Sequence, residues 1–225
     1  MAQEEGSAHL IESLEEALSR AFERVMRHQE RVMIFIDGPN LYTTLRKLGQ
    51  KVDYFKLAEE LARGRRLIRV YIYTTYNPEK PDEKEGMERF RRTLEFGGSF
   101  VVKPIPKHRK FINEGGEKRQ IWVEKGVDVA LVTDMLKLAY SDAYDTAILI
   151  SGDADFVEAV RAVQERGKKV EVVMFSHVVS PELKRVADAF MELSYLLPKV
   201  RLEGWREGST RGGALAGEEH QGQRD

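Results

Sequence analysis

The sequence predicts an α/β protein built on an open parallel sheet with helices on both faces. Five apolar runs of strand length alternate with segments in which apolar residues recur at the three- and four-residue spacing of a helix. Two of these runs, at 32–36 and 148–150, are followed by acidic residues and then by a helical pattern. Because strands joined by helical crossovers are parallel, both runs deliver acidic groups to the same edge of the sheet, where ligands bind in open α/β folds.

The elements follow one another in a regular order. The predicted strands are residues 32–36, 67–73, 99–105, 145–150 and 169–175. The predicted helices are residues 40–48, 54–62, 81–96, 128–140, 155–166 and 181–189. Pro81 and Pro181 stand at the favoured first helical position, and Ser180 is a good N-cap for the last helix.

Both ends of the chain differ from this central pattern. Apolar residues at helical spacing predict an amphipathic helix in residues 1–30, which packs either on its own domain or on a second copy of the chain. The second alternative would make the protein a homo-oligomer. We expect one domain over residues 31–200 and a disordered tail over residues 201–225, which lack periodicity.

Composition excludes several kinds of chemistry. The 225 residues contain no cysteine, so disulfides, thiolate nucleophiles and cysteine-based zinc sites are absent. No apolar run approaches the ~20 residues of a membrane span, and the N-terminus lacks the basic segment of a signal peptide. We therefore expect a cytoplasmic protein with no membrane partner.

Charge is distributed unevenly along the chain. The net charge is −1, yet residues 31–202 carry 30 basic and 25 acidic side chains, and both ends are acidic. A mildly basic body that gathers carboxylates at strand ends favours an anionic substrate bridged by a metal ion. Ordinary surface charge is the alternative explanation.

Four aspartates form the candidate catalytic and metal-binding set. Each falls at a predicted strand end or at the helix start just beyond one: Asp37, Asp128, Asp153 and Asp155. Carboxylates brought into one crevice repel one another unless a cation lies among them, and hard oxygen ligands select Mg²⁺ or Mn²⁺. Taken singly, each aspartate is also explained as a helix cap or as a first-turn residue that complements the helix dipole.

Three further polar residues lie near this set. Asn40 is a candidate to hold a water or a phosphate oxygen, and Ser151 is close enough in sequence to do the same. Asp134 follows Asp128 by six positions, roughly 240° around a helix, so both cannot face one metal ion and Asp134 has at most a supporting role.

Residues 106–123 are predicted to form a long loop or hairpin. Basic residues are dense here, beside Trp122, and they form the candidate RNA-binding set together with Lys125: Lys103, Lys107, Arg109, Lys110, Lys118 and Arg119. Lysine and arginine contact phosphates, and an aromatic ring can stack on a base. The alternative is a solvated hairpin with a buried tryptophan.

Three separated motifs, in order, carry a resemblance to a known family. They are Ile36-Asp37-Gly38-Pro39-Asn40-Leu41-Tyr42, Lys125-Gly126-Val127-Asp128-Val129 with Asp134, and Ser151-Gly152-Asp153-Ala154-Asp155-Phe156. Residues 31–195 thereby resemble the NYN domain, in the LabA-like branch of the PIN-like nucleases. The resemblance implies a three-layer fold with strand order 3-2-1-4-5. It also implies a Mg²⁺- or Mn²⁺-dependent ribonuclease centre in which the four aspartates are ligands and Asn40 is their polar companion.

The function that we expect is a divalent-metal-dependent endoribonuclease acting on RNA, with single strands as the expected substrate. The competing hypothesis is a non-catalytic RNA-binding or regulatory module that uses the same crevice. A phosphoryl-transfer enzyme of another α/β family is a third hypothesis, since a strand-end aspartate can also accept a phosphoryl group. The Asp-x-Asp pattern of haloacid-dehalogenase-like enzymes is absent at Asp37-Gly38-Pro39.

Overall fold

The computed structural model describes residues 14–16, 18–20, 22, 25, 29–114 and 117–202. The chain divides into two compact units, residues 1–30 and 31–225. The described residues between 14 and 25 are helical. The rest of the predicted N-terminal helix, and residues 203–225 of the predicted tail, lie outside the described residues.

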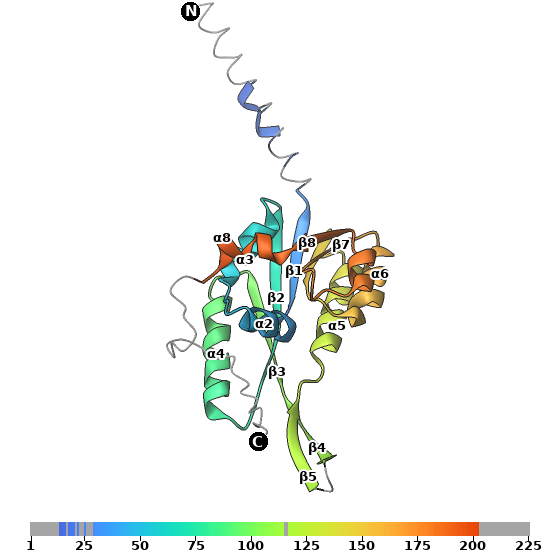
Figure 1. Ribbon diagram of the computed structural model, residues 1–225. Coiled ribbons are helices and arrows are strands. Elements are labelled where there is room, and N and C mark those ends of the chain that lie inside the picture. Colours follow the sequence, from blue (N-terminus) through green and yellow to red (C-terminus); the bar gives the residue numbers. More distant parts are fainter. Residues whose placement is uncertain are drawn as a thin grey trace, which may run out of the picture. The chain divides into compact units, whose positions relative to one another are not determined.

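A parallel sheet forms the centre of the second unit (Figure 1). Within the described residues it has six strands, in the order β3-β2-β1-β6-β7-β8. Every neighbouring pair is parallel. The bounds are β1 Arg31–Asp37, β2 Arg66–Tyr76, β3 Phe100–Pro106, β6 Thr146–Ile150, β7 Lys169–Met174 and β8 Ala189–Glu192.

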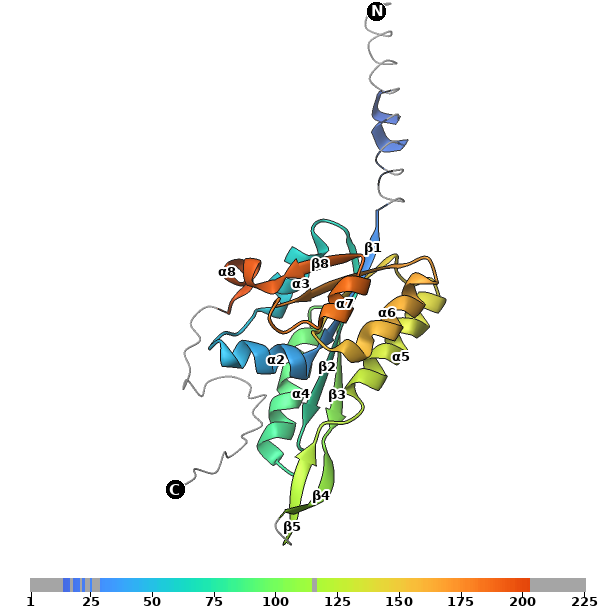
Figure 2. The same cartoon turned by 45° about the vertical axis from the view of Figure 1, so that its right-hand side comes forward.

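Helices cover both faces of the sheet, which confirms the predicted fold class. The helices that pack beside β1, β2 and β3 are α2 (Gly38–Lys47), α3 (Tyr54–Ala62) and α4 (Pro81–Glu95). On the opposite side lie α5 (Val127–Tyr140) and α6 (Val157–Gln164), which contact each other, as the turned view in Figure 2 shows. The second unit also has shorter helical segments among its described residues: η1 Ala154–Phe156, α7 Pro181–Val186, η2 Leu193–Tyr195 and α8 Leu197–Val200. Among the described residues, no helix has the length and apolar character needed to cross a membrane.

The sheet is buried on both faces, which explains the uninterrupted apolar runs of its central strands. Residues 32–36 of β1 and all five residues of β6 are buried. The chain runs from β1 outward to β3 and then returns to β6 on the other side of β1. Strand order therefore reverses between β1 and β6, and in open α/β sheets ligands bind at the carboxyl ends of strands at such a point.

The prediction for the last helix was wrong at its end. A helix over 181–189 was expected, but α7 ends at Val186 and Ala189 begins β8. The backbone N–H of Asp188 donates to the carbonyl of Val170 (2.9 Å), and the Asp188 carboxylate accepts from the Val170 N–H (2.7 Å). The open edge of β7 thus captures this segment as a sixth strand, one more than the order 3-2-1-4-5 contains.

The basic segment folds as a hairpin rather than as a loop. Strands β4 (His108–Glu114) and β5 (Glu117–Val123) pair antiparallel, with Arg109 opposite Trp122. Figure 1 shows the hairpin extending away from the main sheet. The predicted hairpin is confirmed, and its two strands form a sheet separate from the six-stranded one.

Candidate active site

Asp37 ends β1 at the reversal point of the sheet. Its side chain is only 4% exposed. One carboxylate oxygen, Oδ1, accepts from the backbone N–H of Asn40 (3.1 Å) and so caps α2, which begins with Gly38 and Pro39. A Cβ on Gly38 would lie 2.3 Å from the carbonyl oxygen of Tyr73, so only glycine lets α2 begin this close to β2.

Ser151 connects the ends of the two central strands. It directly follows β6 and is completely buried. Its hydroxyl donates to Oδ2 of Asp37 (2.8 Å) and accepts from the backbone N–H of Asp153 (3.2 Å). The hydroxyl is therefore committed on both sides, which fixes the Asp37 carboxylate and the turn after β6 relative to each other.

Asn40 is oriented by the same turn. Its Oδ1 accepts from the backbone N–H of Gly152 (3.2 Å). That contact settles the orientation of the amide, because only the oxygen can accept. Asn40 also lines a cavity at the carboxyl ends of the strands. Because the Gly152 contact uses only the amide oxygen, the NH₂ group is available to donate to a ligand in this cavity.

Two of the predicted aspartates come from the turn after β6. Asp153 accepts from the backbone N–H of Asp155 (3.0 Å) and caps the short helix η1. Its side chain lines the cavity beside Asp37. Asp155 is exposed and is not among the lining residues. Asp153 therefore shares the cavity with Asp37, whereas the Asp155 side chain lies outside it.

Asp128 approaches from the opposite face of the sheet. It lies in the first turn of α5, which begins after Gly126, a residue with φ of 95°. This left-handed conformation favours glycine and turns the chain from the hairpin into the helix. Asp128 lines the same cavity as Asp37 and Asp153, although the three residues are far apart in the sequence.

The pKa values of Asp37 and Asp128 show that the carboxylates of the cavity influence one another. Burial raises the pKa of Asp37 to about 6, and the charges of Asp128 and Asp153 act in the same direction against the hydrogen bonds from Asn40 and Ser151. Partial desolvation and the charges of Asp153, Asp155 and Glu124 raise the pKa of Asp128. A bound cation would offset the part of this pKa shift that comes from the neighbouring carboxylates.

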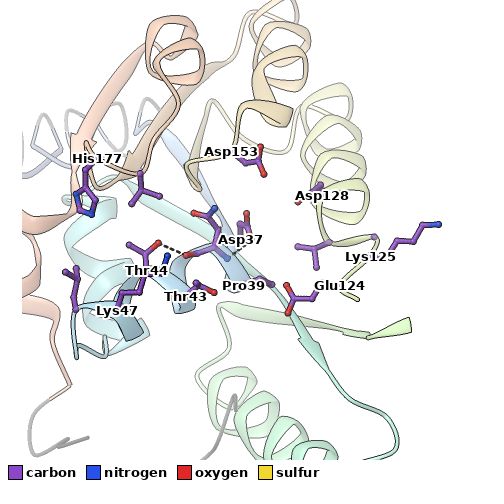
Figure 3. A pocket seen from close by; sticks show the side chains of 15 residues that line it. Asp37, Pro39, Thr43, Thr44, Lys47, Glu124, Lys125, Asp128, Asp153 and His177 are labelled. Atoms are coloured by element: carbon purple, nitrogen blue, oxygen red, sulfur yellow. Dashed lines mark hydrogen bonds between the residues drawn. The ribbon is translucent and has the colours of Figure 1, made fainter. Parts of the chain in front are cut away.

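The cavity has a volume of about 620 Å³. Figure 3 shows Asp37 at its centre, with Asp128 and Asp153 on one side and Lys47 and His177 on the other. The lining residues are Asp37, Pro39, Asn40, Thr43, Thr44, Lys47, Leu48, Glu124, Lys125, Gly126, Val127, Asp128, Asp153, His177 and Val178.

The donor set suits a hard divalent cation. Among the described residues, no three histidine, aspartate or glutamate side chains are gathered closely enough to hold a metal ion by themselves. Mg²⁺ does not need such a cage, since it is usually held by one or two carboxylates together with waters and substrate phosphates. Asp37, Asp128 and Asp153 offer only oxygen ligands, and burial together with mutual repulsion makes a cation favourable there.

Asp134 lies apart from this cluster. It accepts from the Tyr73 hydroxyl (2.9 Å) and forms an ion pair with Lys103 (3.4 Å). Desolvation and the charge of Asp134 hold the pKa of Tyr73 well above its usual range. The geometry connects Asp134 to β2 and β3 rather than to the carboxylates of the cavity.

The predicted RNA-binding residues fall into two groups. Lys103, Lys107 and Arg109 form ion pairs with Asp134, Glu124 and Glu79, respectively. Arg109 also lies over the Trp122 ring, 5.6 Å from its centroid. Lys110, Lys118 and Arg119 are exposed on the hairpin. Lys125 lies outside the hairpin and lines the cavity.

Sequence reasoning missed five polar lining residues: Thr43, Thr44, Lys47, Glu124 and His177. A signal for two of them was present, because Thr43 and Lys47 follow Asn40 at the i+3 and i+7 positions of one helix face. Glu124 and His177 come from separate connections, and nothing in their local sequence relates them to Asp37.

Comparison with known proteins adds a family match. The family model of the NYN domain matches residues 31–194, a range that contains all three motifs around the cavity. The low amplitude and bright protein LabA of Synechococcus elongatus is 27% identical over 170 residues, which cover 73% of this chain and 84% of that protein. An uncharacterised protein of Methanocaldococcus jannaschii is 26% identical over 195 residues, covering 84% of this chain and 68% of that protein.

A solved structure shares the fold. It is the crystal structure of a protein of unknown function from Vibrio parahaemolyticus, with a TM-score of 0.58 and 25% sequence identity. The similarity covers 78% of this chain and 98% of the other.

Proposed function

Because this chain belongs to the NYN domain family, a group of PIN-like nucleases, we propose that it is a divalent-metal-dependent endoribonuclease. The observation that carries the proposal is the meeting of Asp37, Asp128 and Asp153 in one cavity at the reversal point of the sheet. Three carboxylates drawn from three separate elements are unfavourable there without a cation, which is typical of a site shaped by its ligand.

Asp37, Asp128 and Asp153 would hold Mg²⁺ or Mn²⁺ together with waters and the substrate phosphate, with Asp155 near enough to raise the pKa of Asp128. A bound ion would supply an activated water and would neutralise negative charge on the phosphate. Asn40 donates its amide N–H to a phosphate oxygen, because its carbonyl is already occupied by Gly152.

Covalent catalysis by Ser151 does not fit this geometry. The hydroxyl is fully buried and donates to Asp37, so it cannot reach a phosphate. The histidine in the cavity lining, His177, has a ring contact with Phe175 and no hydrogen bond to Ser151 among the described contacts. Ser151 instead positions the Asp37 carboxylate.

The hairpin supports a single-stranded RNA substrate. In the pairing register, Phe111, opposite Gln120, lies two positions from Arg109 and therefore shares a face with Arg109 and Trp122. The Phe111 side chain is 65% exposed. The exposed Phe111 ring and the half-buried Trp122 ring, interleaved with lysine and arginine, can stack on unpaired bases while the cations contact phosphates.

Self-association through the N-terminal unit is a further part of the proposal. Four apolar residues of this unit, Leu14, Leu18, Phe22 and Val25, are helical and recur at spacings of four, four and three. Such a stripe packs well against a copy of itself. Light scattering of the full chain and of a chain lacking residues 1–30 gives the oligomeric state of each. We expect the full chain to be the larger oligomer, and identical oligomeric states would contradict self-association through this unit.

Incubation of the purified protein with single-stranded RNA and Mn²⁺ tests the nuclease activity. We expect cleavage that EDTA abolishes and that Asp153→Asn lowers by orders of magnitude, with Asp82→Asn, an exposed aspartate outside the cavity, as the matched control. Cleavage that survives EDTA would refute the metal mechanism. Tight RNA binding without cleavage at any tested metal concentration would favour the non-catalytic module.

A further inference from the structure

Polar residues line one face of α2, beginning at the acidic cluster and continuing toward the C-terminal end of the helix. Asn40, Thr43, Thr44 and Lys47 occupy positions i, i+3, i+4 and i+7, and all four line the cavity. Seven residues of helix rise roughly 10 Å, so the stripe leads from the aspartates to the far end of the cavity. Thr44 donates to the carbonyl of Asn40 (2.9 Å) and is buried, whereas Thr43 and Lys47 are exposed to the cavity.

The loop after β7 forms the facing wall and is fixed to the acidic turn. The backbone N–H of Ser180 donates to the carbonyl of Gly152 (2.8 Å). A Cβ on Gly152 would lie 2.9 Å from the carbonyl oxygen of Val178, so this glycine is needed for the close approach. His177 precedes Val178 and is exposed, with its ring 5.6 Å from that of Phe175. The loop therefore places His177 in the cavity lining, on the same side of Asp37 as Lys47 (Figure 3).

The two ends of the cavity differ in charge. Asp37, Asp128, Asp153 and Glu124 line one side together with a single cation, Lys125, whereas Lys47 lies on the other side of Asp37 in Figure 3. Within the described part of the chain, Lys47 has no carboxylate within ion-pairing distance, in contrast to Lys103 in β3 and Lys107 just before the hairpin. An unneutralised ammonium in a cavity is a natural partner for an anion such as a phosphate.

We propose that Thr43, Lys47 and His177 form a subsite for the nucleotide adjoining the scissile phosphate. Lys47 and the Thr43 hydroxyl contact the adjoining phosphate, and the His177 ring stacks on the base. This assignment rests on the proposed function, because it takes the scissile phosphate to lie at the aspartates. The subsite is separate from the hairpin, so it binds the strand inside the cavity while the hairpin contacts a more distant part.

Equilibrium binding separates this subsite from catalysis. The full chain is titrated against a fluorescein-labelled uridine decanucleotide in Ca²⁺ over a range of salt concentrations, and the RNA is checked afterwards for integrity. We expect Lys47→Ala to lower the slope of log K against log salt by ~0.7, the value for one lost phosphate contact on a single strand. We expect His177→Ala to weaken binding by about tenfold, as the loss of one base-stacking contact does, without changing that slope.

Conservative and control variants make the outcomes specific. Lys47→Arg and His177→Phe should restore most of the binding, since they keep the charge and the ring. Lys56→Ala, an exposed helical lysine outside the cavity lining, should bind as the wild type does. A wild-type slope in Lys47→Ala together with wild-type affinity in His177→Ala would overturn the subsite, and so would a wild-type chain that binds no RNA. If these variants weaken binding but the wild type cleaves no RNA with any metal, the ribonuclease proposal fails, and Thr43, Lys47 and His177 stand as an RNA contact that is not tied to cleavage.

Discussion

The Ser151 hydroxyl donates to Oδ2 of Asp37 over 2.8 Å, in a place where both residues are buried. This contact joins the ends of β1 and β6, the two strands between which the sheet reverses its order. The Asp37 carboxylate lies in the protein interior, and within the described residues it forms no ion pair with a lysine or an arginine. The acidic site is therefore built on a buried group that folding alone does not favour in its ionised form.

Replacing Asp37 by Asn should stabilise the metal-free protein at neutral pH. The folded pKa of about 6 lies above the ordinary 3.8, so the folded state binds the proton more tightly than the unfolded state does. Stability of the wild type is then fully present below pH ~4 and falls by roughly 3 kcal/mol as pH rises to ~6 and above. Asp37→Asn should lack this fall in urea unfolding with EDTA, and RNA cleavage should be lost. Parallel stability curves for both proteins from pH 4 to pH 8 would contradict the raised pKa.

Ser151→Ala should weaken both stability and metal binding. It removes the donor to Asp37 and the acceptor for the Asp153 N–H, which leaves buried polar groups unsatisfied. We expect a loss of about 1–3 kcal/mol in urea unfolding, and weaker Mn²⁺ binding by calorimetry, because the lost hydrogen bond raises the pKa of Asp37 further. Ser141→Ala, which removes an exposed hydroxyl at the end of α5, is the control. Unchanged Mn²⁺ affinity in Ser151→Ala would show that the contact does not prepare the metal site.

Asn40→Asp should reduce turnover without reducing metal affinity. The aspartate keeps an acceptor for the Gly152 N–H but lacks the amide donor of Asn40, a residue that lines the cavity. Loss of one such donor to a phosphate oxygen typically costs about 10²–10³ in kcat. Asn40→Ala removes both functions, so the comparison isolates the donor. Wild-type kcat in Asn40→Asp would mean that the amide NH₂ does not touch the substrate.

Removing Lys110 and Lys118 together should reduce the salt dependence of RNA binding. Both are exposed on the hairpin, and each lost phosphate contact lowers the slope of log K against log salt by ~0.7. Lys103→Ala should have a smaller effect, because Lys103 already pairs with Asp134. Metal affinity should be unchanged in the double variant. An unchanged slope would show that the hairpin is only a solvated extension and that RNA enters from another side.

Much of the fold was predictable because its elements are determined by local patterns. The five apolar runs became β1, β2, β3, β6 and β7, and α3 has the predicted bounds of 54–62. Strand β8 was missed because residues 189–192 are strand only through pairing with the open edge of β7. Its formation depends on a partner distant in sequence, which a local pattern does not contain.

The sequence by itself determined the fold class, the family and the positions of the aspartates at the ends of strands and the starts of helices. Those features follow from hydrophobic periodicity and motif order, which are properties of short segments. Only the tertiary structure decided which side chains share the cavity: Asp153 lines it and Asp155 does not, Asp134 binds Tyr73, and Lys47 and His177 form the far wall. The physical reason is that side-chain contacts depend on strand register, helix rotation and loop paths, which are set when distant segments pack together.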